Sequence, residues 1–273
     1  MLFNVPIFML KALIASLFLP LAVMGSTIIV ELRKSSFLVV EVAHAVLAGA
    51  SLGIVIGHLC GLPVDPTFIA LAFALASGAL AEFLGERSER ESAIGVLFSA
   101  NMSLAVLFMS VIPPEELTKV WGLLIGDILA LTTLDLSLLA VSSVLIASLF
   151  ILFHKELVYL ALDEEGSLAL GLRARPLHYL AVLLISLASV FSVKAIGMIL
   201  VYAILVIPGA VFSRRESSVI KAMDFSALLS LFSLLFALLV SSLAGIPPSG
   251  VAGLVLFSTY ALFLKLRKKF GSS

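Results

Sequence analysis

The feature that most constrains this chain is a series of long apolar runs that recurs from one end of the sequence to the other. A helix needs about 20 mainly apolar residues to cross the hydrocarbon core of a bilayer. Of the 273 residues, 62% are hydrophobic and only 12% are charged, whereas soluble domains are about half apolar and about a quarter charged. A soluble core of this size cannot absorb so much apolar surface, so the sequence predicts a polytopic membrane protein.

Turn residues and charges divide the chain into nine predicted spans. The alternation typical of a β-barrel is absent from the sequence, so helices are left as the way to satisfy the backbone in lipid. The predicted fold is therefore all-α, with a single transmembrane domain over residues 1–273. The spans are expected at about residues 7–30, 36–59, 67–84, 92–112, 136–153, 178–193, 196–212, 226–243 and 249–265. The boundary between the sixth and seventh spans is the weakest, because only the stretch FSVKAIG separates them.

The basic residues predict the orientation, because Lys and Arg collect in cytoplasmic loops. If the N-terminus lies outside, the inner segments carry every Lys and Arg except Lys11, Lys119 and Lys194, which is 14 of the 17. We therefore predict nine crossings, with the N-terminus outside and the C-terminus inside. The longest inner connection, about residues 154–177, is too short to fold alone but long enough for one or two helices at the membrane surface.

Several classes of function lack the residues they require. The 17 basic and 17 acidic residues balance, so no overall field would attract nucleic acid. The lone Cys60 excludes an internal disulfide and a thiolate metal cluster. The sequence contains neither a nucleotide-binding P-loop nor an H-E-x-x-H zinc motif, and no nucleophile has a partnering base. We therefore predict that the chain is not an enzyme.

Two ionisable residues lie inside the second predicted span. Burying such groups costs about 2.5–3.5 kcal/mol on insertion scales, so each one suggests a function. In VVEVAHAVLAGASLG, residues 39–53, Glu41 and His44 are three apart, and we expect them on one face of a helix. Gly49 and Gly53 beside this face would let another helix approach closely. A carboxylate and an imidazole suit Mn²⁺, Fe²⁺ or Zn²⁺, and two ligands bind weakly enough to release the ion, so we predict a transit contact.

Structural explanations compete with this hypothesis. Glu41 and His44 could pair with each other or with a neighbouring helix. His58, at the outer end of the same span, could simply be solvated there. Glu82, near the inner end of the third span, is expected to reach the interface or to pair with Arg87. Lys194 is expected to mark the outer turn between the sixth and seventh spans.

The inner connection contains a pattern typical of permeases that work with an ATPase. Glu165 is followed by two small residues, three variable residues and Gly171, the spacing of the EAA-type loop by which ABC importer permeases dock on their ATPase subunits. Three further motifs occur in AHAVLAG (43–49), GDIL (126–129) and GMILVYAILVIPGA (197–210). In order and spacing, these motifs make the whole chain resemble the zinc/manganese/iron permease family of ABC importers.

The resemblance implies a homodimeric permease in the prokaryotic cytoplasmic (inner) membrane. Its partners would be an ABC ATPase subunit on each inner face and an extracytoplasmic metal-binding protein outside, and ATP binding would drive alternating access. No permanently bound cofactor is expected, because the zinc, manganese or iron ion is cargo. Glu165, Gly171 and Arg173 would couple the chain to the ATPase. Asp127 and His58 are expected as a gate or second metal contact, with a helix N-cap as the alternative for Asp127.

The chain departs from the family pattern beside the histidine. The family has an acidic residue four positions before it, where this chain has Val40. Either Glu41 substitutes for that residue through a rotation of the helix, or this chain has a different metal chemistry. Three other functions stay open. An ABC permease for haem, siderophore or cobalamin would leave Glu41 and His44 unexplained. A cation-coupled secondary carrier would use these two residues as a proton relay. An intramembrane enzyme would need a third reactive group near His44.

Overall fold

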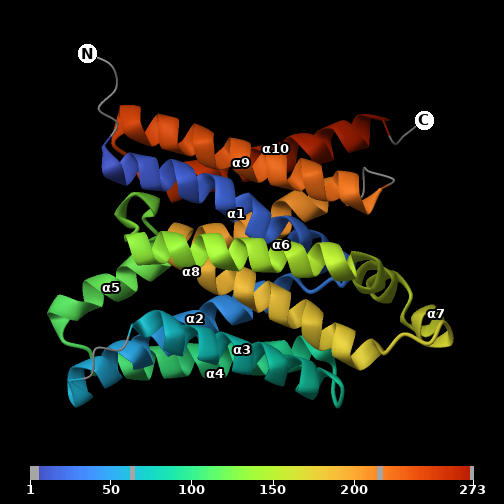
Figure 1. The fold of residues 1–273 in the computed structure, drawn as a ribbon, viewed down its shortest axis with the longest axis horizontal. Helices are drawn as coiled ribbons and strands as arrows, with labels where there is room; N and C mark the ends of the chain where they lie inside the picture. Colours follow the sequence, from blue (N-terminus) through green and yellow to red (C-terminus); the bar gives the residue numbers. More distant parts are fainter. Residues whose placement is uncertain (1–5, 62–64, 214–217, 271–273) are drawn as a thin grey trace.

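The structure, a computed structural model, describes residues 6–61, 65–213 and 218–270. The part that is described contains helices and no strand, so the predicted all-helical class is confirmed. Figure 1 shows the long helices running roughly side by side in one bundle. The elements are α1 (Ile7–Leu32), α2 (Ser36–Cys60), α3 (Pro66–Gly85), α4 (Arg90–Met109), α5 (Pro114–Ile125), the 3₁₀ turn η1 (Ile128–Ala130), α6 (Thr133–Leu162), α7 (Glu164–Ala169), α8 (Ala174–Phe212), α9 (Val219–Ala244) and α10 (Pro248–Phe270).

Eight helices within the described residues are long and apolar enough to cross a membrane. They account for all nine predicted spans, because the sixth and seventh predicted spans both fall inside α8, which has 39 residues. One helix was missed: α5 lies in a stretch predicted as an outer loop. Its signals are present in the sequence, since Pro114 begins the helix and two acidic residues occupy its first turn, as helix starts prefer.

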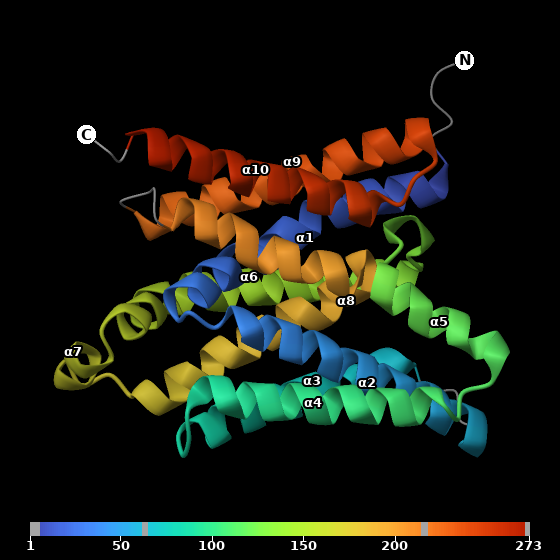
Figure 2. The same ribbon diagram turned by 180° about the vertical axis from the view of Figure 1, so that it is seen from behind.

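The long helix α8 folds back on itself at Gly197, which has φ 75° and ψ 156° inside an otherwise helical segment. Ser26 donates a hydrogen bond to the carbonyl of Leu184, while the next residue, Thr27, accepts one from the amide of Gly209. A straight helix would separate positions 184 and 209 by about 37 Å. The two legs, residues 174–196 and 198–212, therefore run in opposite directions, as both views show (Figures 1 and 2).

The two ends of the bundle gather the segments that the charge pattern assigned to opposite sides. At one end Arg33, after α1, pairs with Glu82 near the end of α3. At the other end Lys194 of α8 pairs with Asp65, just before α3, and with Asp135 at the start of α6. The beginning of α1 and the end of α10 also lie at opposite ends of the molecule (Figures 1 and 2). Predicted inner and outer segments are thus separated in space.

Helix ends follow the local sequence. The side chain of Asp65 accepts a hydrogen bond from the amide of Thr67 at the start of α3. Thr132 and Asp135 form a reciprocal capping box at the start of α6, which satisfies amides that have no partner inside the helix. Left-handed Gly61 ends α2 and is open on all sides, as expected for a residue without a Cβ.

Small residues bring α2 and α3 into close contact, as the sequence predicted. A Cβ on Gly49 would lie 2.8 Å from the Cα of Ala70, and one on Gly53 would lie 2.9 Å from the Cα of Pro66. Only glycine tolerates such an approach. The most buried spans are α1, α2 and α8, so the stretch that holds Glu41 and His44 belongs to the centre of the bundle.

Candidate metal path and coupling site

His44 lies on α2 with its ring partly buried. Its Nδ1 is 2.7 Å from the carbonyl oxygen of Val40. A carbonyl can only accept, so Nδ1 carries a proton, and the tautomer protonated at Nδ1 keeps its lone pair on Nε2, the form that binds a metal ion. The ring meets Phe98 of α4 edge-on, with 4.6 Å between ring centroids. This contact and the hydrogen bond hold the imidazole in one orientation.

Glu41 is fully buried between three helices. Its Oε1 accepts hydrogen bonds from Ser77 of α3 and from Asn101 of α4, the latter at 2.8 Å. Its Oε2 has no hydrogen-bond partner among the described residues. Asn101 also donates to Ser77 at 2.7 Å. The carboxyl group therefore ties α2, α3 and α4 together, as the structural explanation for Glu41 anticipated.

The structure does not join Glu41 and His44 into one site. Both side chains lie on the side of α2 that meets α4, but within the described residues no hydrogen bond or ion pair links them. The same part of the chain contains no group of three or more His, Cys, Asp and Glu side chains able to enclose a metal ion. A mutual pairing of the two residues is thus not the explanation for their burial.

The two outer candidates lie on separate elements. His58 is exposed near the end of α2, in agreement with the expectation that it is solvated. Asp127 accepts a hydrogen bond from the amide of Leu129 at 2.9 Å and caps η1, which confirms the N-cap reading. It is also exposed, at the edge of a cavity of about 500 Å³ whose wall includes Trp121 and Pro248.

The predicted coupling segment begins where α6 ends. Asp163 caps the short helix α7 by accepting from the amide of Gly166 at 2.9 Å, and a turn then leads into α8. Glu165, Gly171 and Arg173 are all exposed. Gly171 has φ 81° and open space around it. A partner could therefore reach this surface without displacing any part of the chain that the structure describes.

A charged cluster at the same end was not predicted. Glu82 neither pairs with Arg87 nor reaches an exposed position. Its Oε2 lies 2.9 Å from Arg33, and its Oε1 lies 2.8 Å from Arg90. Arg87 instead lies over the ring of Phe83, 4.2 Å from its centroid. The prediction of a Glu82–Arg87 pair is wrong because α3 ends at Gly85, and the turn that follows brings Arg90 back beside Glu82.

A second unpredicted cluster lies at the opposite end. Lys194 reaches Asp135 at 2.7 Å and Asp65 at 3.5 Å, beside a cavity of about 580 Å³ that Lys119 also lines. Burial disfavours the charged form of Asp65, but hydrogen bonds from Thr67 and the ammonium of Lys194 outweigh it and hold the pKa of this carboxyl below its ordinary value. Lys194 does mark the turn of α8, as predicted, and it also ties that turn to the starts of α3 and α6.

The fold and these sites define a polytopic helical membrane protein with distinct polar clusters at its two ends. A model of the ABC 3 transport family matches residues 6–268, and the chain belongs to this family. This confirms the family that the sequence motifs indicated.

Relatives and solved structures agree with this assignment. The manganese transport system membrane protein MntC of Listeria innocua is 29% identical over 265 residues, which cover 94% of this chain and 89% of the relative. A probable iron transport system membrane protein of Haemophilus influenzae is 29% identical over 205 residues, 74% of this chain and 72% of the relative. The structure described as PsaBC from Streptococcus pneumoniae in complex with Fab shares the fold, with a TM-score of 0.82, 23% identity and coverage of 94% and 91%.

Proposed function

We propose that the chain is the membrane-spanning permease of an ABC importer that moves Mn²⁺, Fe²⁺ or Zn²⁺ into the cytoplasm by alternating access. The observation that carries this proposal is the family match over residues 6–268, together with relatives named for manganese and iron transport. The chain itself has no P-loop, so ATP hydrolysis falls to a separate ATPase subunit. A separate extracytoplasmic protein would deliver the metal, and a second copy of the permease would complete the path. The location that fits is the prokaryotic inner membrane.

The proposed topology has nine crossings, with the N-terminus outside and the C-terminus inside. Two observations support it. The legs of α8 run in opposite directions about Gly197, so each can count as a crossing of its own. The basic segments, which prefer the cytoplasm, gather at the end where α7 lies, whereas Lys194 and the cap residue Asp65 lie at the other end.

We further propose that His44 contacts the metal during transit and that Glu41 contributes a second contact, with Asp127 and His58 acting nearer the outer end. The tautomer of His44 supports the first role, because its Nε2 keeps the lone pair. For Glu41 the support is its unpartnered Oε2. A rotation of α2 would be needed to bring this oxygen toward the ion.

Reconstitution tests the function. The chain, its cognate ATPase and its binding protein are placed in vesicles, and the metals taken up in the presence of ATP are identified by elemental analysis. We expect ATP-dependent uptake of Mn²⁺, Fe²⁺ or Zn²⁺. Uptake by the purified chain alone, driven by an ion gradient, would instead establish a secondary carrier, and ATP-dependent uptake of haem or a metal chelate alone would establish a different cargo.

Substitutions test the two transit residues. We expect His44→Ala to lower uptake by about tenfold or more, the scale seen when groups around a metal are lost. His154→Ala is the matched control, because the Nδ1 of His154 also binds a carbonyl of its own helix, at 2.7 Å from Ile151. Glu41→Gln preserves an acceptor for Ser77 but removes the ionisable group, so unchanged uptake in this variant would leave Glu41 with a structural role only.

The coupling segment is tested at Gly171. We propose that Glu165, Gly171 and Arg173 contact the ATPase, and Gly171→Trp would place a large side chain in the open space around that position. Gly171→Ala is the control, since it carries the same positive-φ cost without the bulk. We expect the tryptophan variant to lose the ATPase on co-purification and the alanine variant to retain it. Equal retention by both variants would rule out a contact at this position.

A further inference from the structure

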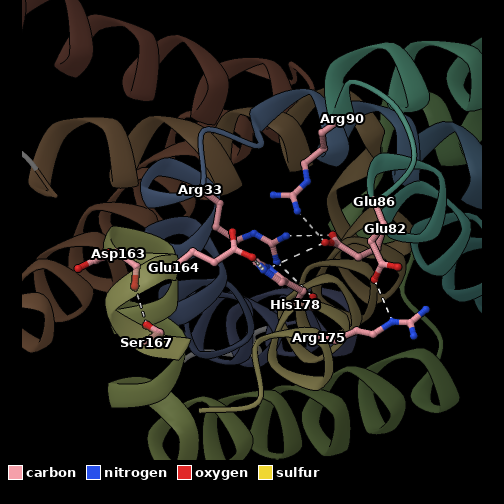
Figure 3. A network of polar contacts seen from close by, with 9 residues as sticks. All are labelled: Arg33, Glu82, Glu86, Arg90, Asp163, Glu164, Ser167, Arg175 and His178. Carbon is pink, nitrogen blue, oxygen red and sulfur yellow. Dashed lines mark hydrogen bonds and ion pairs between the residues drawn. The ribbon is translucent and has the colours of Figure 1, made fainter. Parts of the chain in front are cut away.

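The charged cluster around Glu82 connects the short helix α7 to the rest of the bundle (Figure 3). His178 of α8 stands between two carboxylates: its Nε2 is 3.0 Å from Glu164 of α7, and its Nδ1 is 3.9 Å from Glu82 of α3. Arg33 donates to the carbonyl oxygen of His178 at 3.2 Å and to Glu82 at 2.9 Å. Arg90 of α4 completes the cluster. Through His178 and this cluster, the six-residue helix α7 is connected to the ends of four spans.

The balance of positive and negative charge in this cluster includes a contribution from Glu164 of α7. Arg33 and Arg90 bring two positive charges to Glu82, whose side chain is only 3% exposed. The single carboxylate of Glu82 cannot neutralise both, and Glu164, which contacts His178, adds a second but weaker negative charge. Burial is the main cause that lowers the pKa of Arg33, and Glu82 and Glu164 both act in the opposite direction. If α7 moved away, Arg33 would stay buried with less compensation, which is costly.

Two buried nitrogens show that the cluster is not fully satisfied. Nε of Arg33 and Nδ1 of His178 are buried and have no hydrogen-bond partner among the described residues. A ring nitrogen that carries a proton can donate to the carboxylate that it faces. Nε2 of His178 is within hydrogen-bond distance of Glu164, and Nδ1 lies about 1 Å beyond hydrogen-bond range of Glu82. The ring therefore has a second partner within reach.

The helices held by Glu82 also hold the candidate metal path. Glu82 and Ser77 lie on α3, and Arg90 and Asn101 lie on α4. Ser77 and Asn101 are the two donors to Glu41 of α2. A displacement of α3 and α4 at the Glu82 end would therefore change the environment of the carboxyl group in the centre of the bundle, because helices move as rigid elements.

We propose that Glu164, His178 and Glu82 form the internal linkage by which a movement of α7 is transmitted to the inner ends of α1, α3 and α4. His178 and Glu82 are positioning residues: they act on the path through the helices and do not touch the metal. This inference rests on the proposed function, since α7 lies in the segment that would dock on the ATPase. Breaking the linkage would leave ATP hydrolysis in place but separate it from transport.

The test is the number of Mn²⁺ ions transported per ATP hydrolysed by the complete importer in vesicles. Glu164→Gln removes the charge of a side chain that is 55% exposed, so folding should survive. His178→Gln keeps a donor in the position of Nε2 but none toward Glu82. We expect each variant to lower the ratio by about threefold to thirtyfold, the range for residues in coupling networks, while the ATPase still co-purifies. The ratio of the double variant should be no lower than that of the more impaired single variant, because both substitutions break the same linkage.

The matched control is Arg175→Gln. Arg175 lies three positions before His178 on α8, and the substitution breaks its exposed ion pair with Glu86 at the end of α3. Its ratio should stay within twofold of the wild-type value. Wild-type ratios in both Glu164→Gln and His178→Gln, or multiplied losses in the double variant, would overturn the linkage. A wild-type importer that moves none of Mn²⁺, Fe²⁺ and Zn²⁺ would overturn the proposed function itself, so the two failures are distinguishable.

Discussion

The elbow of α8 gives the sharpest prediction, because two glycine backbones meet there. A Cβ on Gly197 would lie 2.5 Å from the amide nitrogen of Gly126, and a Cβ on Gly126 would lie 2.1 Å from the nitrogen of Gly197. Gly197 also has φ 75° and ψ 156°, a region that costs other residues about 1–3 kcal/mol. Forcing a methyl group against backbone adds about 1–3 kcal/mol more. Gly197→Ala should therefore lower the free energy of unfolding by about 2–6 kcal/mol.

Two controls separate these causes. Gly245→Ala carries a positive-φ penalty at φ 67° and ψ 27° but meets open space, so we expect a loss of about 1–2 kcal/mol. Gly122→Ala, in α5, has neither problem and should be neutral or slightly stabilising. Thermal unfolding of purified protein in detergent is the assay, with about 2–4 °C in Tm for each kcal/mol. A Gly197→Ala Tm no lower than that of Gly245→Ala would refute the close contact.

The remaining predictions concern the polar clusters. Glu82→Gln should lower the free energy of unfolding by about 3–5 kcal/mol, because buried Arg33 loses its counter-charge. Glu86→Gln, in an exposed pair, should lower it by at most about 1 kcal/mol. Thermal unfolding compares the two variants, and equal losses would contradict the role of burial. Asn101→Leu removes a hydrogen-bond donor from the buried carboxyl of Glu41 and should lower the free energy of unfolding by about 1–3 kcal/mol. Chemical denaturation measures this loss, and an unchanged free energy would mean that the hydrogen bond contributes nothing. Asp65 has a lowered pKa, so its contribution is present above the unfolded pKa of about 3.9 and is lost as pH falls through the folded value. Asp65→Asn should flatten the fall in Tm below about pH 4, and an unchanged profile would show that Asp65 plays no part.

Much of the fold is predictable because the bilayer leaves few choices. Apolar length predicts where a helix can cross, and the charge pattern separates the two ends, so Arg33 and Glu82 meet at one end and Lys194 meets Asp65 at the other. Glycine spacing predicts that another helix packs closely on α2, and the structure identifies that helix as α3. Each of these properties can be read along the sequence. The bilayer preserves them in the folded chain, because a span without water must satisfy its backbone as a helix.

The partners of the buried charges were not predictable, because they depend on where helices end and how they rotate. Glu82 lies five positions before Arg87, yet its partners are Arg33, 49 positions away, and Arg90. Sequence separation carries no information about such a choice once α3 ends and the chain turns back. The donors to Glu41 come from two other helices for the same reason.

Glu41, which is fully buried, and His44, which is partly buried, meet the cost of burial in two different ways. Glu41 is compensated by hydroxyl and amide donors that belong to the protein, so its presence in a span does not by itself require a metal. His44 satisfies only Nδ1 through its own helix and keeps the lone pair of Nε2, an acceptor that a passing cation can use. The imidazole is therefore the stronger candidate ligand, and the carboxyl group connects α2 to α3 and α4, the helices whose ends the Glu82 cluster holds.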